Sequence, residues 1–421
     1  MVKGRMVWCA GLAGVALFLT GCGPKPSPTP TPSPAPAVTV PLSLTGPAAG
    51  DDIRIGLVLP PVQGEGSEYR DAAEGAQVAA YRFRLSGAHV TVVAAQEDGT
   101  AVGIETALAS LAEQSVSGIV VGTAGAQLRQ ALAAAPVRVP VLLPYDSPDA
   151  PLTDVWTTGP SRAGIAAALR QALTDSGVSR PFALVEQGWT LPSSIVPVAT
   201  ASVQADGELP GAVVDAIEAG IADSVVIAGS ATTQAGLVVG VQQGLGSWQA
   251  PVFLTPEAQT PAFGEAVTRA GAGDGVLISV GSDTDDPAAL EQGLAGQRAS
   301  AFFVALRLAA GDDACKTAFG DAPFASVAQS ADTASHDAVV ALVRAVEKAG
   351  STSPDAITTA LSGLTLDQSQ AGLAGPALRF ASATALADAD VVPVFASAQN
   401  PGERPQDATD ARQLFWFATK P

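Results

Sequence analysis

The chain has 421 residues, and its 40 acidic against 22 basic side chains give a formal net charge of −18. This acidic balance excludes nucleic-acid binding, which needs Lys and Arg to neutralise phosphates. The sequence holds only two His and three scattered Cys, so it offers no clustered ligands for a zinc or iron–sulfur site. We expect no metal and no cofactor, and the length predicts two domains of ordinary size.

The first residues have the pattern of a secretory signal. Lys3 and Arg5 precede an apolar stretch that ends in Leu-Thr-Gly-Cys at Cys22. The stretch is short for a helix that crosses a bilayer and is typical of a cleaved signal peptide. Its end resembles the bacterial lipobox, in which the Cys becomes the acylated first residue. We therefore predict a signal peptide at 1–21 and a lipid anchor on Cys22, at the extracytoplasmic face of the bacterial cell membrane; an uncleaved anchor helix is the alternative.

A proline-rich segment follows the cysteine. Pro occupies every second position from Pro24 to Pro36, alternating mainly with Ser, Thr and Ala. Such a run favours the extended polyproline II conformation and cannot build a core. Residues 22–52 are therefore predicted to be a semi-stiff tether between the membrane and a globular body.

From Ile53 onward, short apolar runs alternate with helical patterns. The runs 53–60, 90–94, 118–121 and 140–143 are bounded by turn residues or by segments whose apolar residues recur every three to four positions. Runs that are apolar throughout and joined by helical crossovers predict a parallel sheet covered on both faces. Ligands bind such sheets beyond the carboxyl ends of the strands.

The order and spacing of these segments resemble those of the type I periplasmic binding proteins, in the leucine/isoleucine/valine-binding branch. The segments that carry the resemblance are IRIGLVLP (53–60), GIVVGTAGAQL (118–128), VPVLLPYDSP (139–148), APVFLTPEA (250–258) and SHDAVVALVRAVEKAGSTSPDAITTAL (335–361). The resemblance implies an α/β fold of two doubly wound parallel-sheet lobes, joined by three crossing segments near 158–161, 281–286 and 375–380. It places lobe one at 53–158 plus 283–375, and lobe two at 161–280 plus 377–421.

Lobe two departs from the family pattern after its first strand. Only Gln187–Pro197 separates the run Phe182–Glu186 from the strand-like run Val198–Val203, where the family has a long helix. A parallel crossover usually takes a dozen or more residues and a helix. Lobe two is therefore predicted to lack one helix, or its second strand pairs in another way.

The resemblance implies a ligand site whose lobe-one part follows the third and fourth strands. Thr123 and Gln127 stand in the first of these loops, where the family's hydroxyl groups hold a ligand carboxylate. Tyr145, Asp146 and Ser147 stand in the second. Asp146 would repel a ligand carboxylate if it faced the cleft, because two like charges a few ångströms apart disfavour each other.

Four further positions complete the implied site. Glu257 matches a family acid that holds an amino group, and Tyr69 lies next to a position that is often aromatic. Trp189 offers an apolar or cation–π wall, and His336 replaces an aromatic residue that often reaches the cleft. The structural alternatives are rim packing for Tyr69 and Trp189, helix capping for Asp146 and Glu257, and a helix-start surface or hinge position for His336.

The function predicted from these features is capture of a small polar molecule, such as an amino-acid-like ligand, by a lipid-anchored solute-binding protein that serves an ABC permease. Since no Lys or Arg stands at the matching positions, we expect a ligand with a positive or neutral head. A sensor or surface-interaction lipoprotein without transport is the alternative. An envelope enzyme is the remaining one, but the sequence has no Gly-x-Ser-x-Gly elbow, His-Glu-x-x-His motif or Walker loop, so we expect no enzyme.

Overall fold

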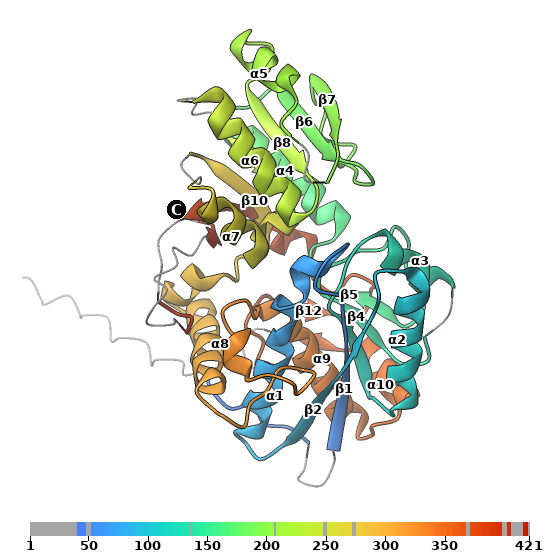
Figure 1. Cartoon of the computed structure of the whole chain (residues 1–421). Helices are drawn as coiled ribbons and strands as arrows, with labels where there is room; N and C mark the ends of the chain where they lie inside the picture. The colour runs from blue at the N-terminus through green and yellow to red at the C-terminus, as the bar shows by residue number, and fades with distance from the viewer. Residues whose placement is uncertain are drawn as a thin grey trace, which may run out of the picture. The chain divides into compact units, whose positions relative to one another are not determined.

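The computed structural model describes residues 40–47, 52–134, 137–205, 208–246, 251–271, 275–367, 371–397, 402–405 and 416–419. The predicted signal peptide, Cys22 and most of the predicted tether lie outside them. None of the described helices combines the length and apolar character needed to span a bilayer. The described residues form two sheet-based lobes within one compact unit (Figure 1).

Lobe one is built on a five-stranded sheet in which all neighbours are parallel. The strand order is β2-β1-β3-β4-β5, so the direction of winding reverses between β1 and β3. The bounds are β1 Asp52–Leu59, β2 His89–Gln96, β3 Gly118–Val121, β4 Val141–Leu143 and β5 Val155–Thr157. The four predicted apolar runs thus form four of the five strands of this sheet, and β5 was not predicted.

Helices cover both faces of this sheet. Their bounds are α1 Gly75–Arg84, α2 Ala101–Glu113, α3 Ala126–Ala134, α8 Leu294–Ala310, α9 Thr333–Ala349 and α10 Pro354–Ser362. Ile55 and Leu57 of β1 pack with α1 and α9, whereas the neighbouring Val58 packs with α2. This alternation follows from the two-residue period of a strand and explains why β1 is apolar throughout.

Lobe two holds a seven-stranded sheet in the order β14-β13-β10-β9-β8-β6-β7. The bounds are β6 Pro181–Glu186, β7 Ala199–Val203, β8 Ser224–Ala228, β9 Val252–Leu254, β10 Leu277–Gly281, β13 Val392–Ser397 and β14 Trp416–Ala418. The strands β7, β6, β8, β9 and β10 are parallel to one another. β13 pairs antiparallel with β10, and β14 pairs antiparallel with β13.

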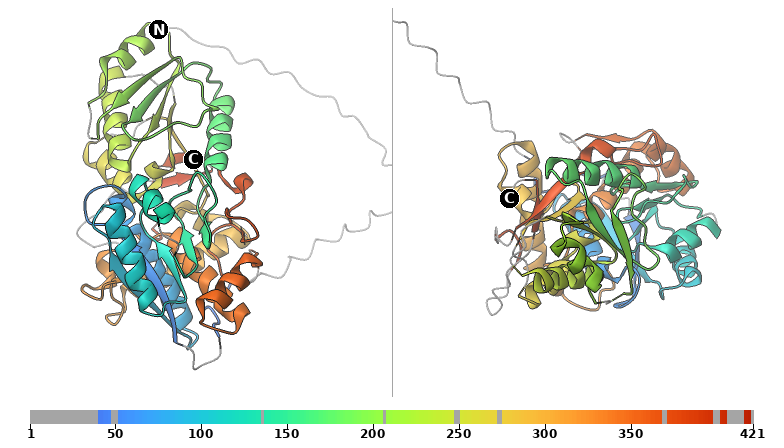
Figure 2. Two further views of the ribbon diagram at one scale, coloured as in Figure 1. Left: turned by 90° about the vertical axis from the view of Figure 1, so that its right-hand side faces the viewer. Right: turned by 90° about the horizontal axis from the view of Figure 1, so that it is seen from above.

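Four helices flank the second sheet, on both of its faces (Figure 2). They are α4 Arg162–Asp175, α5 Gly211–Glu218, α6 Ala231–Leu245 and α7 Pro261–Arg269. α4 packs on the face that carries Phe253 and Ile278. α5, α6 and α7 pack on the face that carries Ile227 and Leu254.

Short elements complete the two lobes. These are the 3₁₀ turns η1 Ser67–Tyr69, η2 Ala72–Glu74, η3 Pro256–Gln259, η4 Asp286–Leu290, η5 Phe324–Ser326 and η6 Asp388–Asp390, and the small sheet of β11 Thr365–Leu366 with β12 Leu378–Arg379. Two of the 3₁₀ turns, η1 and η3, carry residues of the candidate site described below.

The connection between β6 and β7 contains no helix, as one of the two alternatives predicted. β7 nevertheless pairs parallel to β6, with Phe182 opposite Ala199. The crossover is an irregular loop that packs Ile195, 6% exposed, against the face covered by α4. A helix-free loop of this length can therefore join two neighbouring parallel strands, and β7 pairs directly with β6.

Two predicted boundaries differ from the structure. Residues 40–47, assigned to the tether, pack on lobe one: Leu44 is 2% exposed, and Arg82 donates to the carbonyl of Leu42 at 2.9 Å. The third crossing lies near 387–391 rather than 375–380. Trp156 donates to the carbonyl of Phe380 at 3.2 Å, and Thr384 bridges to Thr157, so the chain up to about residue 386 belongs to lobe one.

Candidate ligand-binding site

A cavity of about 1090 Å³ is lined by residues of both lobes. Its walls include the segments that follow the carboxyl ends of β1, β3, β4 and β5 in lobe one and of β6, β9 and β10 in lobe two. Parallel α/β sheets bind ligands at this edge. The volume lies just above the usual range for sites that take small molecules, roughly 300–1,000 Å³.

Two stacked tyrosines form part of the lobe-one wall. The rings of Tyr69 and Tyr145 lie 4.5 Å apart at an interplanar angle of 17°. Burial raises the pKa of both phenols well above 10, so both are neutral at physiological pH. The Tyr145 hydroxyl lies near Asp332 and Ser335 without a well-formed hydrogen bond to either. The pair therefore presents neutral aromatic surface to the cavity, while the Tyr145 hydroxyl itself is buried.

Asp146 lines the cavity but is not the free acid that the sequence suggested. It is 7% exposed and accepts a hydrogen bond from the Gly125 N–H at 2.7 Å. Arg129 Nη1 lies 3.0 Å from both of its carboxylate oxygens. Its charge is therefore compensated inside lobe one by an arginine that sequence reasoning missed.

Glu257 is the lobe-two acid of the site. It lies in η3, just beyond β9, and its Oε2 is buried without a hydrogen-bond partner among the described residues. The pKa of Glu257 is raised to about 7, mainly by burial and in smaller part by the charges of Glu68 and Asp146, against the lowering effect of a hydrogen bond with Thr255. A buried carboxyl with no counter-charge is a place where a cation is stabilised.

Two more cavity acids have raised pKa values. Burial raises the pKa of Asp285 to about 7 and that of Asp332 to about 6. Asp332 caps α9 by accepting from the N–H and the hydroxyl of Ser335 at 3.0 and 2.7 Å. Clusters of carboxyl groups with raised pKa values are typical of functional sites.

The loop after β1 contributes two glutamates that the sequence reasoning did not select. Glu65 accepts from the N–H groups of Ala126 and Gln127 at 2.6 and 3.2 Å, and so caps α3. Glu68 accepts from the N–H of Ala231 at the start of α6, in lobe two. No sequence motif marks these glutamates, because their partners lie far along the chain.

The structure also brings five arginines to the cavity. Four of them pair with carboxylates: Arg129 with Asp146, Arg162 with Asp149, Arg269 with Glu265, and Arg404 with Asp286. Arg170 is exposed on α4. Most of the positive charge at the cavity is thus already matched by acids of the protein.

Six of the nine predicted site residues line the cavity, and three do not. The six are Tyr69, Tyr145, Asp146, Ser147, Trp189 and Glu257. Thr123 is 2% exposed and hydrogen-bonds to Glu97. The Gln127 side chain accepts from the Ala101 N–H at 3.1 Å. Thr123 lies in the expected loop and Gln127 in the first turn of α3, but both side chains contact other parts of lobe one.

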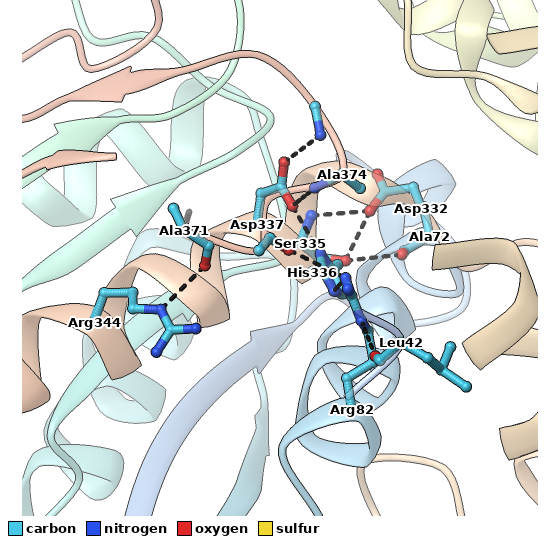
Figure 3. Close-up of polar contacts among 12 residues, drawn as sticks. Leu42, Ala72, Arg82, Asp332, Ser335, His336, Asp337, Arg344, Ala371 and Ala374 are labelled. Carbon is cyan, nitrogen blue, oxygen red and sulfur yellow. Dashed lines mark hydrogen bonds and ion pairs between the residues drawn. The ribbon is translucent and has the colours of Figure 1, made fainter. Parts of the chain in front are cut away.

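His336 is also outside the cavity, and it is buried rather than at the surface. It is fully buried, with Nδ1 2.7 Å from Asp337 Oδ1 and Nε2 3.0 Å from Arg82 Nη1 (Figure 3). Since Arg82 can only donate, the histidine is neutral with its proton on Nδ1. Burial lowers its pKa, in agreement with this tautomer.

The polar network around His336 ties distant segments of lobe one together. Asp337 accepts from the N–H groups of Ala374 and Gly375, both at 2.7 Å. Arg82 donates to the carbonyls of Leu42 and Gly372 at 2.9 and 3.1 Å. The network thus holds the segment 40–47, which was assigned to the tether, and the segment before β12 against α1 and α9 (Figure 3).

No protein-family model matches the sequence, and no curated protein is similar to it. Solved structures are similar in fold. A type 1 periplasmic binding protein from Bordetella pertussis Tohama I has a TM-score of 0.61 and 17% identity, covering 82% of this chain and 96% of that one. The chain has the type I periplasmic binding protein fold. The predicted fold class is confirmed.

Two further structures with the type I binding fold were solved with ligands. A branched-chain amino acid transporter substrate-binding protein from Streptococcus pneumoniae, in complex with isoleucine, has a TM-score of 0.61 and 17% identity, covering 87% of this chain and 99% of that one. An ABC transporter substrate-binding protein from Desulfitobacterium hafniense, in complex with Leu, has a TM-score of 0.60 and 17% identity, covering 87% and 100%. These three structures are each described as a binding protein and none as an enzyme.

Proposed function

We propose that this chain is an extracytoplasmic solute-binding protein that takes a small amine-bearing molecule into the cavity between its lobes. The observation that carries the proposal is Glu257, whose Oε2 is buried at the cavity without a partner among the described residues. An ammonium group beside it would form a charge-assisted hydrogen bond and relieve the cost of the buried carboxyl.

The remaining walls suit the same ligand. The faces of Tyr69 and Tyr145 offer cation–π contacts from lobe one, and Trp189 offers them from lobe two. A ligand that contacts Glu257 and the tyrosines together binds both lobes at once. Such a ligand favours the state in which the lobes are close, because only that state offers all of its contacts.

Delivery to an ABC permease is the role we propose for this binding. Its support is that the matched structures with isoleucine and Leu are both described as transporter substrate-binding proteins. One observation favours the alternative of a sensor or surface-interaction lipoprotein: the helix-free connection between β6 and β7 changes the surface of lobe two. Deletion of the gene separates the two roles, since loss of ligand uptake indicates transport and unchanged uptake indicates sensing.

A thermal-shift screen of a soluble variant that lacks residues 1–22 tests the binding proposal. We expect amines to raise the melting temperature and simple carboxylic acids not to. At a concentration of 100 Kd, a ligand stabilises the native state by about 2.7 kcal/mol, which corresponds to several degrees. Stabilisation by simple carboxylic acids alone would contradict the proposal.

We also infer that Cys22 is acylated and anchors the protein to the membrane. Cys22→Ser is expected to abolish labelling by a palmitate analogue and to move the protein out of the membrane fraction or leave its signal uncleaved. The matched control is Cys9→Ser, which lies within the predicted signal peptide and should leave labelling intact. Equal labelling of the wild type and Cys22→Ser would refute the anchor.

A further inference from the structure

The first turn of α3 forms part of the cavity edge, where Ala124, Gly125 and Arg129 line it. The free N–H groups at a helix N-terminus, together with the helix dipole, make such a position favourable for an anion. A carboxylate of a ligand in this cavity would be stabilised best there, with Arg129 alongside.

The protein's own carboxylates already occupy this position. Glu65 accepts from the N–H groups of Ala126 and Gln127, and Asp146 accepts from the N–H of Gly125. Arg129 is engaged with both oxygens of Asp146 at 3.0 Å. A ligand carboxylate would have to displace Glu65 and would then face the charge of Asp146.

The local backbone is shaped to let Glu65 reach α3. Gly66 has φ +78°, and a Cβ there would collide with Thr123 Oγ1. Gly125 has φ +122°, and a Cβ there would collide with the Glu65 carboxyl. Both positions need glycine, for the positive φ and for the close approach. The two glycines therefore leave the space that the Glu65 carboxyl needs at the start of α3.

A second helix that opens onto the cavity follows the same pattern. Asp332, Thr333 and Ala334 at the start of α9 line the cavity, and Asp332 takes the N–H of Ser335. At both α3 and α9, then, a carboxylate of the protein binds the N–H groups that would attract an anion. Glu257, by contrast, leaves an oxygen free for a cation.

We propose that Glu65 is a specificity-determining residue: it fills the carboxylate position of the site, so that the protein takes amines without a neighbouring carboxylate in preference to α-amino acids. This inference rests on the proposed function. In this proposal the Glu65 carboxylate takes the position of an amino acid's α-carboxylate, while Glu257 remains available to bind the amine.

Calorimetric titrations with matched pairs test the inference. Each pair is an α-amino acid and the amine left when its carboxylate is removed: leucine and 3-methylbutylamine, phenylalanine and 2-phenylethylamine, ornithine and 1,4-diaminobutane. For the wild type we expect at least one amine to bind ten-fold or more tightly than its amino acid. In Glu65→Ala that ratio should fall at least ten-fold, because the amino acid gains affinity. Glu65→Gln keeps an acceptor but loses the charge, and it should give an intermediate ratio.

The control is Glu113→Ala, an exposed glutamate at the end of α2, which should leave the ratio unchanged. An unchanged ratio in both Glu65 variants, with amines still bound, would overturn this inference and leave the proposed function standing. A wild type that binds the amino acid as tightly as the amine would overturn it as well. Absence of binding by every amine, in wild type and variants alike, would overturn the proposed function and the inference with it. If Glu65→Ala does not fold, Glu65→Gln decides.

Discussion

Replacement of Glu257 by Gln is expected to weaken amine binding by about 10- to 100-fold. A hydrogen bond to a charged group contributes about 1.5–3 kcal/mol, and about 1.4 kcal/mol corresponds to a factor of ten in affinity. Gln keeps the shape and one acceptor but cannot neutralise an ammonium. Isothermal titration calorimetry measures the loss, and Glu218→Gln, an exposed glutamate at the end of α5, is the matched control.

The same variant should change the pH dependence of binding. Burial raises the pKa of Glu257 to about 7, so the carboxyl gains its charge between about pH 6 and pH 8. Amine binding by the wild type should therefore strengthen over that interval, whereas binding by Glu257→Gln should not. Equal affinities of wild type and variant at pH 8 would contradict the assigned role.

The stability of the ligand-free protein should change with pH in the opposite direction to amine binding, and it is measured independently. The ordinary pKa of a glutamate is 4.5, and between that value and the native pKa of about 7 the native state holds more protons than the unfolded state. The free energy of unfolding therefore falls as pH rises through this interval. Gln does not titrate, so Glu257→Gln should lose less stability than the wild type between pH 5 and pH 8. A variant that is merely misfolded would lose stability at both pH values.

Arg82→Met is expected to destabilise the protein by about 3–5 kcal/mol, the usual cost of breaking a buried charged network. Arg82 is 1% exposed, and its guanidinium donates to three carbonyls and to His336. Met fills similar volume but leaves these acceptors without a donor. Denaturant unfolding measures the free energy of unfolding.

The matched control for this prediction lies two residues further along α1. Arg84 pairs with Asp312, and the two side chains are 52% and 35% exposed. Arg84→Met should therefore cost at most about 1 kcal/mol, as is usual for exposed pairs. Limited proteolysis should also cut Arg82→Met near residues 40–47 sooner than Arg84→Met. Equal stability of the two variants would show that the network around His336 contributes little.

The sheets could be predicted because their signals are local. The runs at β1, β2, β3 and β4 are apolar and bounded by turn or helix-start residues, so each strand can be recognised without its partners. The antiparallel partner of β10, β13, is also apolar, but it contains Pro393, which speaks against a strand in the sheet interior. Its place in the sheet depends on pairing with a segment far along the chain. The third crossing was misplaced for the same reason: β12 is held in lobe one by β11 and by Trp156.

The location of the site could also be predicted, but the pairing of its side chains could not. The loops after β3 and β4 meet at the cavity because the carboxyl ends of parallel strands share one edge. Which groups remain free is decided by partners far along the chain: Arg129 is 17 residues from Asp146, and Glu65 is 61 from Ala126. Rather than into the cavity, His336 points into lobe one, where it contacts Arg82, a residue 254 positions away in the chain.

The decisive measurement is a crystal structure of the protein with the tightest-binding amine from the screen. We expect the amine in the cavity between the lobes, with its nitrogen about 2.7–2.9 Å from Glu257 Oε2, the range of a charge-assisted hydrogen bond. Glu65 should still accept from the N–H groups at the start of α3. A ligand bound outside the cavity, or an amine nitrogen directed away from Glu257, would contradict this expectation.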